Sequence, residues 1–210
     1  GGFAPNLPAN EAGLGYMVRA IEGAGYSTEE IGISLDVAST EFYKDGAYHM
    51  DGKALTGEEL SDIYATWVDE YPLLSIEDGF AEDDWRSWSH CMRDIGDKVQ
   101  LVGDDLFVTQ SERLSMGIDS KAANAILVKV NQVGTITETL ETMDLASAHG
   151  FNSVVSHRSG ETEDTTIADL AVGTRAGQIK TGAPARSDRV AKYNQLLRIS
   201  NEVSEYRSPF

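Results

Sequence analysis

The sequence of 210 residues contains a single cysteine, Cys91. One cysteine cannot form an internal disulfide, and such scarcity is typical of proteins from a reducing compartment. The sequence also has no apolar run of about 18 residues, the length that a membrane-spanning helix requires. We therefore expect a cytoplasmic protein without a membrane span.

The sequence also has few basic residues. The chain has 17 Lys and Arg against 34 Asp and Glu, which gives a formal net charge of −17. Because nucleic-acid binding needs a basic surface, this balance argues against a nucleic-acid partner. The excess of acid is either an ordinary solvated surface that aids solubility or an adaptation to high salt, which would screen the repulsion.

The sequence lacks linker-like and low-complexity segments, so we expect one domain with one sizeable core. What it contains instead is a regular alternation of short apolar runs and helix-like segments. Strands are predicted at residues 31–38, 73–76, 99–103, 125–130, 152–155 and 176–179. Helices are predicted at residues 11–24, 56–71, 81–93, 111–117, 135–149, 163–173 and 186–205. A hairpin with Asp45-Gly46 at its turn is predicted at residues 42–50.

Alternating strands and helices predict a parallel α/β sheet, and the spacing narrows the fold class. A (β/α)₈ barrel uses about 250 residues, or roughly 30 per unit, and carries its functional groups at the carboxyl ends of its strands. The predicted strands end at the polar residues Asp36, Glu77, Asp104, Lys129, His157 and Lys180. The intervals are 23 to 28 residues, except for 41 residues between Asp36 and Glu77, where the hairpin is inserted. An open doubly wound sheet usually binds its ligand at a switch point, so fewer of its strands would contribute functional residues. We therefore predict a TIM-type (β/α) barrel with about six of its eight strands present.

Three successive strands end in the acids Asp36, Glu77 and Asp104. In a barrel these carboxylates would converge and repel one another unless a cation lay between them. Carboxylate and water oxygens are the ligands that Mg²⁺ prefers, so the trio predicts a magnesium site. Each acid alone would more often be a loop carboxylate or a helix cap, but that interpretation is far weaker for all three at barrel spacing. Asp78 and Asp105 should point elsewhere, because successive side chains of a strand alternate in direction.

Two lysines end later strands. Lys129 lies in the apolar run ILVKVN, and Lys180 lies in IKTG. Burial and nearby cations would favour the neutral, basic form of Lys129, which is what a general base needs. The alternative is a lysine that reaches out of the sheet or pairs with an acid. Two lysines opposite three acids indicate a site for an anionic substrate.

The run VVSHRSGETEDT places His157, Arg158 and Ser159 directly after a buried strand. Arg offers a planar fork of donors and Ser a further donor, so this loop predicts an anion site. His157 alone would more often be structural. Beside Arg158 and Ser159, it is expected to touch the substrate.

Six long motifs then resemble those of one family: IEDGFAEDDW, GDDLFVT, LVKVNQVGT, SHRSGETEDT, IKTGAPARSDR and KYNQLLRI. They resemble the enolases of glycolysis over nearly the whole chain. The resemblance implies a lyase that reversibly dehydrates 2-phosphoglycerate to phosphoenolpyruvate with Mg²⁺. The enzyme with this activity is a phosphopyruvate hydratase. The resemblance also implies that the full-length protein forms a homodimer or a higher homo-oligomer.

The resemblance implies a role for each predicted site residue. Asp36, Glu77 and Asp104 would bind the metal, and Lys129 would be the catalytic base. The substrate would be bound by His157, Arg158, Ser159 and Lys180. The carboxyl-terminal EVSEYRSPF departs from the family pattern.

The family pattern also implies segments that are not in the sequence. The family's general-acid glutamate lies in a Gly-Asp-Glu just before the position of Gly1, and a lid domain and two further barrel strands precede it. We therefore expect residues 1–210 to be a partial carboxyl-terminal barrel domain that is inactive on its own.

Two other functions stay open. The chain could belong to a relative that acts on another carboxylate substrate, although such proteins need no phosphate loop like SHRSGET. It could also be a pseudoenzyme or a non-catalytic binding protein, such as a plasminogen binder in a cell-surface or secreted pool. The presence of Lys129 and all three acids argues against the loss of catalysis.

Overall fold

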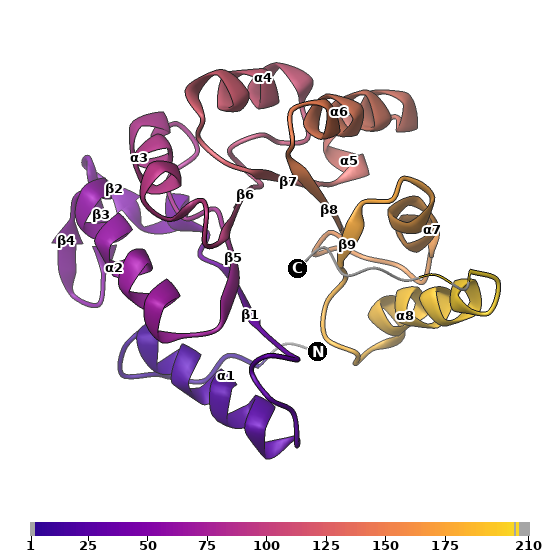
Figure 1. Cartoon of the computed structure of the whole chain (residues 1–210), viewed down its shortest axis with the longest axis horizontal. Coiled ribbons are helices and arrows are strands. Elements are labelled where there is room, and N and C mark those ends of the chain that lie inside the picture. Colours follow the sequence, from indigo (N-terminus) through magenta and orange to yellow (C-terminus); the bar gives the residue numbers. More distant parts are fainter. Residues whose placement is uncertain (1–2, 204, 206–210) are drawn as a thin grey trace.

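Six parallel strands form the main sheet in a computed structural model that describes residues 3–203 and 205. Their order in the sheet is their order along the chain, so each strand pairs with the strand of this sheet that follows it in the sequence. Figure 1 shows the strands curling around a common centre with the helices outside them, which confirms the predicted fold class of a partial (β/α) barrel. The strands are β1 (Ile33–Asp36), β5 (Leu73–Glu77), β6 (Gln100–Gly103), β7 (Ala125–Val128), β8 (Asn152–Ser156) and β9 (Gly177–Lys180).

Helices follow the strands along the chain and cover the outer face of the sheet. At the start of α2 the hydroxyl of Thr56 accepts from the backbone N–H of Glu59, and the Glu59 carboxylate accepts from the N–H of Thr56, as the sequence predicts. The helices are α1 (Glu11–Gly23), the 3₁₀ helix η1 (Ser39–Phe42), α2 (Gly57–Glu70), α3 (Trp85–Ile95), α4 (Ser111–Ser120), α5 (Val130–Val133), α6 (Ile136–Ala148), α7 (Thr166–Gly173) and α8 (Ser187–Ser200). No helix within the described ranges has both the length and the apolar character needed to cross a membrane.

A second, antiparallel sheet is inserted between β1 and α2. The predicted hairpin is present, but the sheet has a third strand that we did not predict, and its members are β2 (Tyr43–Lys44), β3 (Ala47–Met50) and β4 (Lys53–Leu55). Asp51 and Gly52 both have positive φ and form the second tight turn, as Asp45 and Gly46 form the first. The missed strand thus follows a second Asp-Gly pair.

An aromatic cluster anchors the carboxyl end of β5. Phe80 contacts the rings of Tyr48, Tyr64 and Trp88 edge to face, with ring centroids 5.6 to 5.9 Å apart. All four side chains are buried, and the Tyr64 hydroxyl donates to the carbonyl of Gly79 at 2.8 Å. Because these contacts fix the residues just after β5, they also fix the position of Glu77.

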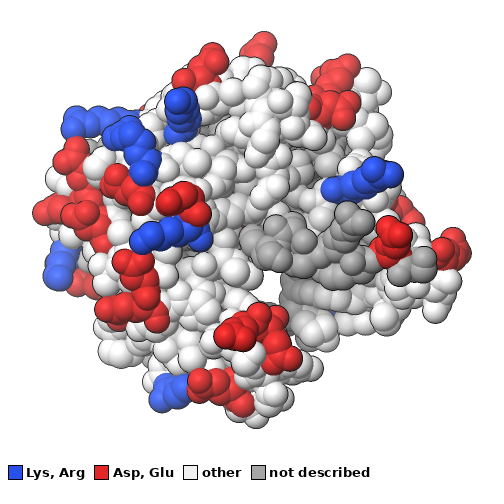
Figure 2. Space-filling model, viewed as in Figure 1, with Lys and Arg blue, Asp and Glu red and all other residues white. Residues whose placement is uncertain are grey.

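The ring of strands is open on one side. β1 and β9 are the two edges of the sheet, and each has a single hydrogen-bonded neighbour. In Figure 1 the opening lies between α1 and α8, and Figure 2 shows a notch in the surface at the same place. On the face seen in Figure 2, acidic side chains are spread around the periphery and basic ones do not form a single patch.

Several predicted element ends need correction. α3 begins at Trp85 rather than at residue 81, because the Asp84 carboxylate accepts from the N–H of Ser87 and caps the helix there. α7 begins at Thr166 rather than at residue 163, after Asp164 accepts from the N–H of Thr166. α8 ends at Ser200 rather than at residue 205, and residue 204 lies outside the described residues.

Candidate active site

The polar residues predicted at the strand ends lie on one rim of the sheet. Asp36, Glu77 and Lys180 are the last residues of their strands. The other three follow their strands within one residue, and they are Asp104, Lys129 and His157. Lys129 was predicted inside a strand, but β7 ends at Val128 and the short helix α5 begins at Val130. The structure therefore brings all six positions to the carboxyl ends of parallel strands, where a barrel carries its site.

Lys180 bridges the open side of the sheet. Its Nζ lies 2.8 Å from Oδ2 of Asp36 and 2.9 Å from each carboxylate oxygen of Glu77. Lys180 and Asp36 are on the two edge strands, so this contact shows how far the sheet has curled. Burial alone would lower the pKa of Lys180, but the adjacent Glu77 and Asp36 carboxylates outweigh burial and raise it.

Glu77 is the buried member of this group, with 6% of its surface exposed. Burial is the largest cause that raises the pKa of Glu77, and the negative charge of Asp36 raises it further. The ammonium of Lys180 opposes both effects but does not cancel them. The group as a whole has three carboxylates, Asp36, Glu77 and Asp104, against two lysines, and this excess of negative charge favours binding of a further cation.

Lys129 and Asp104 form the second ion pair, between the ends of two central strands. The Nζ of Lys129 contacts Oδ2 of Asp104, and the two side chains are only 16% and 11% exposed. The amide nitrogen of Gln132 lies 3.5 Å from the other Asp104 oxygen. The Thr109 hydroxyl accepts from the backbone N–H of Lys129 at 3.0 Å and donates to the Gln132 amide oxygen at 2.9 Å. These contacts hold the lysine in a fixed place.

Asp78 does not point away from the site, so that prediction was wrong. Its two carboxylate oxygens accept from the backbone N–H groups of Asp104 and Asp105, each at 2.9 Å. Asp78 has a positive φ of 44°, so it has left the strand and the alternation of side chains no longer applies. Burial raises the pKa of Asp78 to about 7, although the two N–H donors oppose this shift.

The carboxylates fit a hard divalent cation through their chemistry. The predicted trio of Asp36, Glu77 and Asp104 offers oxygen ligands only. The negative charges of Asp36 and Asp104 both help to raise the pKa of Glu77, so the three carboxylates lie close enough to repel one another. A different trio is drawn closer together, because ligand oxygens of Asp78, Asp104 and Asp105 all lie within 4.8 Å of one another. Asp78 already accepts two backbone hydrogen bonds, so its first role is to shape the turn after β6.

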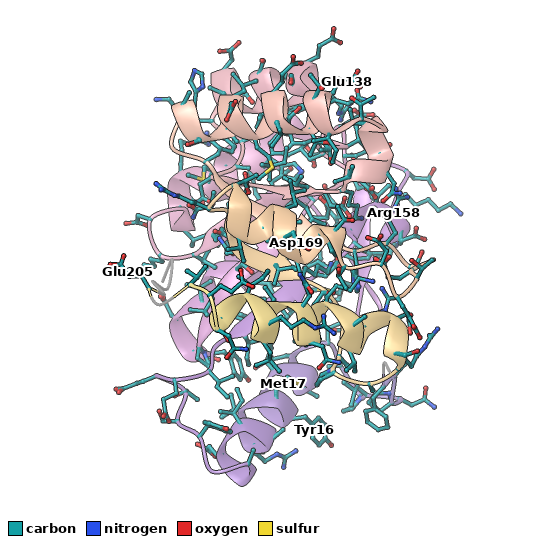
Figure 3. The ribbon with its side chains drawn as sticks, turned by 90° about the vertical axis from the view of Figure 1, so that its right-hand side faces the viewer. Tyr16, Met17, Glu138, Arg158, Asp169 and Glu205 are labelled. Carbon is teal, nitrogen blue, oxygen red and sulfur yellow. The ribbon has the colours of Figure 1, made fainter. Side chains whose placement is uncertain are left out.

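The loop after β8 carries the predicted anion-binding residues. His157 donates its backbone N–H to the carbonyl of Lys180 at 3.0 Å, which joins the loop to the end of β9. Figure 3 shows Arg158 toward the right of the molecule, on the side opposite Glu205. Among the described residues the Arg158 guanidinium has no ion-pair partner. Its donors therefore stay available to an anion.

Sequence reasoning missed three residues that contact this site, namely Gln132, Arg189 and Lys192. Gln132 follows Lys129 by one turn of α5, and the other two lie in α8 and contact the loop after β8. A lysine in the first turns of an otherwise ordinary helix gives no local signal. Only its burial, with 1% of Lys192 exposed, distinguishes it, and burial is not visible in the sequence.

The curled parallel sheet, with its helices outside and its charged cluster at the carboxyl ends of the strands, defines an α/β barrel protein. The family model of the enolase C-terminal TIM barrel domain matches residues 1–208. A curated relative named enolase, from Beutenbergia cavernae, is 58% identical over 206 residues, which are 98% of this chain and 48% of the relative. The chain belongs to the enolase family. It spans about half the length of that relative.

Proposed function

We propose that the protein containing this chain reversibly dehydrates 2-phosphoglycerate to phosphoenolpyruvate, with Lys129 as the base. Proton abstraction next to a carboxylate needs a basic group held in place, and Lys129 is held by Asp104 and by the Thr109 hydroxyl. The observation that carries the proposal is the gathering of two lysines and three carboxylates from five strand ends at one rim.

Asp36, Glu77 and Asp104 would hold Mg²⁺. When bound there, the ion would supply positive charge that stabilises the negative charge developing on the substrate carboxylate. Lys180 would bind that carboxylate, since its ammonium already binds two carboxylates of the protein. Each lysine would therefore exchange a protein carboxylate partner for a role toward the substrate.

Arg158, Ser159 and His157 would bind the phosphate. The Arg158 guanidinium can donate two parallel hydrogen bonds to phosphate oxygens, and the Ser159 hydroxyl can donate a third. Arg158 and Ser159 follow β8, which lies between the strand that precedes Lys129 and the strand that ends in Lys180. A phosphate on this loop would leave the rest of a small substrate beside both lysines.

The test is the Lys129→Met variant of the natural gene product, assayed for the ultraviolet absorbance of phosphoenolpyruvate. We expect kcat to fall by at least about 10²-fold, which is the contribution typical of a general base. Lys53→Met, at an exposed position of strand β4, is the matched control and should keep its activity. Near-normal turnover by Lys129→Met would contradict the assignment of the base. A wild-type protein that binds Mg²⁺ without turnover would favour a non-catalytic binding protein.

A further inference from the structure

Two cationic side chains of α8 hold the loop that follows β8. Arg189 and Lys192 are three residues apart, so they lie on the same face of the helix. Both reach residues of the segment 157–162, about 30 positions earlier in the chain. Neither residue belongs to the set that the sequence assigned to the site.

Arg189 uses its two terminal nitrogens on this loop. Nη1 lies 2.6 Å from Nδ1 of His157 and donates to the carbonyl of Arg158 at 2.9 Å. Nη2 donates to the carbonyl of Ser159 at 3.1 Å. The third nitrogen, Nε, lies 3.3 Å from Oδ2 of Asp188, which forms an ion pair without hydrogen-bond alignment. One guanidinium thus contacts three consecutive residues of the predicted anion loop.

Lys192 is a buried lysine that makes the second attachment. A side chain of this type is rarely buried unless its charge is paired. Its Nζ donates to the carbonyls of Thr162 and Asp188, the latter at 2.8 Å, and lies 3.4 Å from Oε1 of Glu161. These three oxygens match the three donors of an ammonium. Glu161 in turn accepts from the N–H of Arg158 at 3.4 Å, so Lys192 also acts on the predicted anion site.

The contact between Arg189 and His157 has a consequence for the imidazole. A guanidinium has five donors and no acceptor, so His157 Nδ1 can face Nη1 only as an acceptor. The proton of the neutral ring must then lie on Nε2. Burial and the charges of Arg189 and Lys180 lower the pKa of His157, which agrees with a neutral ring.

Gly182 packs against both partners from the loop after β9. A Cβ built on Gly182 would lie 3.0 Å from Cδ of Arg189 and 3.1 Å from Cε1 of His157. Its φ of +86° also favours glycine. The pair therefore sits in a close-fitting space that only glycine leaves open.

We propose that Arg189 and Lys192 are positioning residues which hold the anion loop through its backbone, and that Arg189 keeps the proton of His157 on Nε2. The loop then offers a donor from each of three residues, through Nε2–H of His157, the Arg158 guanidinium and the Ser159 hydroxyl. Such a set suits a phosphate group and gives His157 the role of a donor rather than a base. The phosphate part of this inference rests on the proposed function, but the tautomer rests on the geometry alone.

The first experiment is long-range ¹H–¹⁵N NMR of the histidine rings in the natural gene product at neutral pH. We expect His157 to show an unprotonated Nδ1 and a protonated Nε2. Arg189→Lys keeps a donor beside Nδ1 and should keep this pattern, whereas Arg189→Met should lose it. The matched control is Arg93→Met, which removes a similar contact, that of Arg93 with Nδ1 of His90 at 3.3 Å on an exposed helix face. This variant should leave the pattern of His157 unchanged. A protonated Nδ1 in the wild type, or an unchanged pattern in Arg189→Met, would overturn the tautomer assignment.

The second experiment measures kcat and KM for 2-phosphoglycerate. Lys192→Met keeps most of the apolar stem but no donor, and we expect KM to rise about tenfold, the effect of one charge-assisted hydrogen bond. Arg189→Lys should also raise KM, since one ammonium cannot hold both carbonyls, and it serves if Lys192→Met does not fold. Unchanged KM in both variants would reject the positioning role. Wild-type protein without turnover would instead reject the proposed function, and the NMR result would still decide the tautomer.

Discussion

The central strands and the edge strands of the sheet differ sharply in their surroundings. Every residue of β6 and β7 is buried, whereas β9 has none that is fully buried and β1 has one. The central strands have neighbours on both sides, and the edge strands have a neighbour on one side only. The difference shows that burial here follows a strand's place in the ring rather than its apolar content, because Ile179 of β9 is as apolar as Ile126 of β7.

The two ion pairs of the candidate site follow the same division. Lys129 and Asp104, beside the central strands, are 16% and 11% exposed, whereas Lys180 and Asp36, on the edges, are 33% and 47% exposed. Water screens the second pair far more than the first. The site therefore has a dry part, which holds the proposed base, and a wet part, which joins the two edges of the sheet.

The largest expected difference is in thiol reactivity, between the buried core that includes α3 and the edge strand β1. Cys91 is completely buried in α3, and burial raises the pKa of its thiol to about 12. In the chain of residues 1–210, a thiol introduced by Ser34→Cys on the edge strand β1 would be exposed. With a thiol-specific chromogenic reagent, this variant should show one fast and one slow thiol. The rates should differ by at least about 10³-fold, because Cys91 reacts only through unfolding.

The wild-type protein is the control for the slow phase and should show that phase alone. Equal rates for the two thiols would mean that the core around α3 opens as readily as the edge strand β1, and the comparison of buried core with edge would fail.

Matched isoleucines give the next largest effect. Ile126 in β7 is completely buried, and Ile179 in β9 is partly exposed. Ile126→Ala should lower the free energy of unfolding by about 2–5 kcal/mol, the range for a large core side chain. Ile179→Ala should cost less, because less apolar surface returns to water. Urea unfolding monitored by tryptophan fluorescence measures both, and equal losses would contradict a weaker edge.

Local patterns in the sequence predicted much of this architecture. The hydrogen bonds of Thr56 and Glu59, the strands that end in Asp36 and Glu77, and the Asp45-Gly46 turn all depend on residues a few positions apart. The same locality explains why the parallel order was predictable, since each strand pairs with the next in the chain. The fold class follows from signals that a single pass along the chain can read.

The remaining features depend on contacts between distant residues. Lys180 reaches Asp36 from 144 positions away, and Arg189 reaches His157 from 32 positions away. Asp78 was misplaced because a positive φ turned its side chain out of the strand pattern. Such features depend on how the sheet curls and on which side chains become buried, and neither is encoded in a local period. The sequence predicted the residue types at the site, but not which carboxylate each lysine binds.

The smallest expected effect concerns the wet ion pair. Asp36→Asn removes one carboxylate from Lys180, but Lys180 keeps both oxygens of Glu77 at 2.9 Å. The change also removes the negative charge that helps to raise the pKa of Glu77, so a repulsion is lost together with an attraction. Because the two effects oppose each other in a half-exposed place, the free energy of unfolding should change by less than about 1 kcal/mol. Urea unfolding beside Asp62→Asn, an exposed acid on α2, measures the difference between the two variants. A loss of several kcal/mol specific to Asp36→Asn would show that this pair, and not the central strands, holds the open ring together.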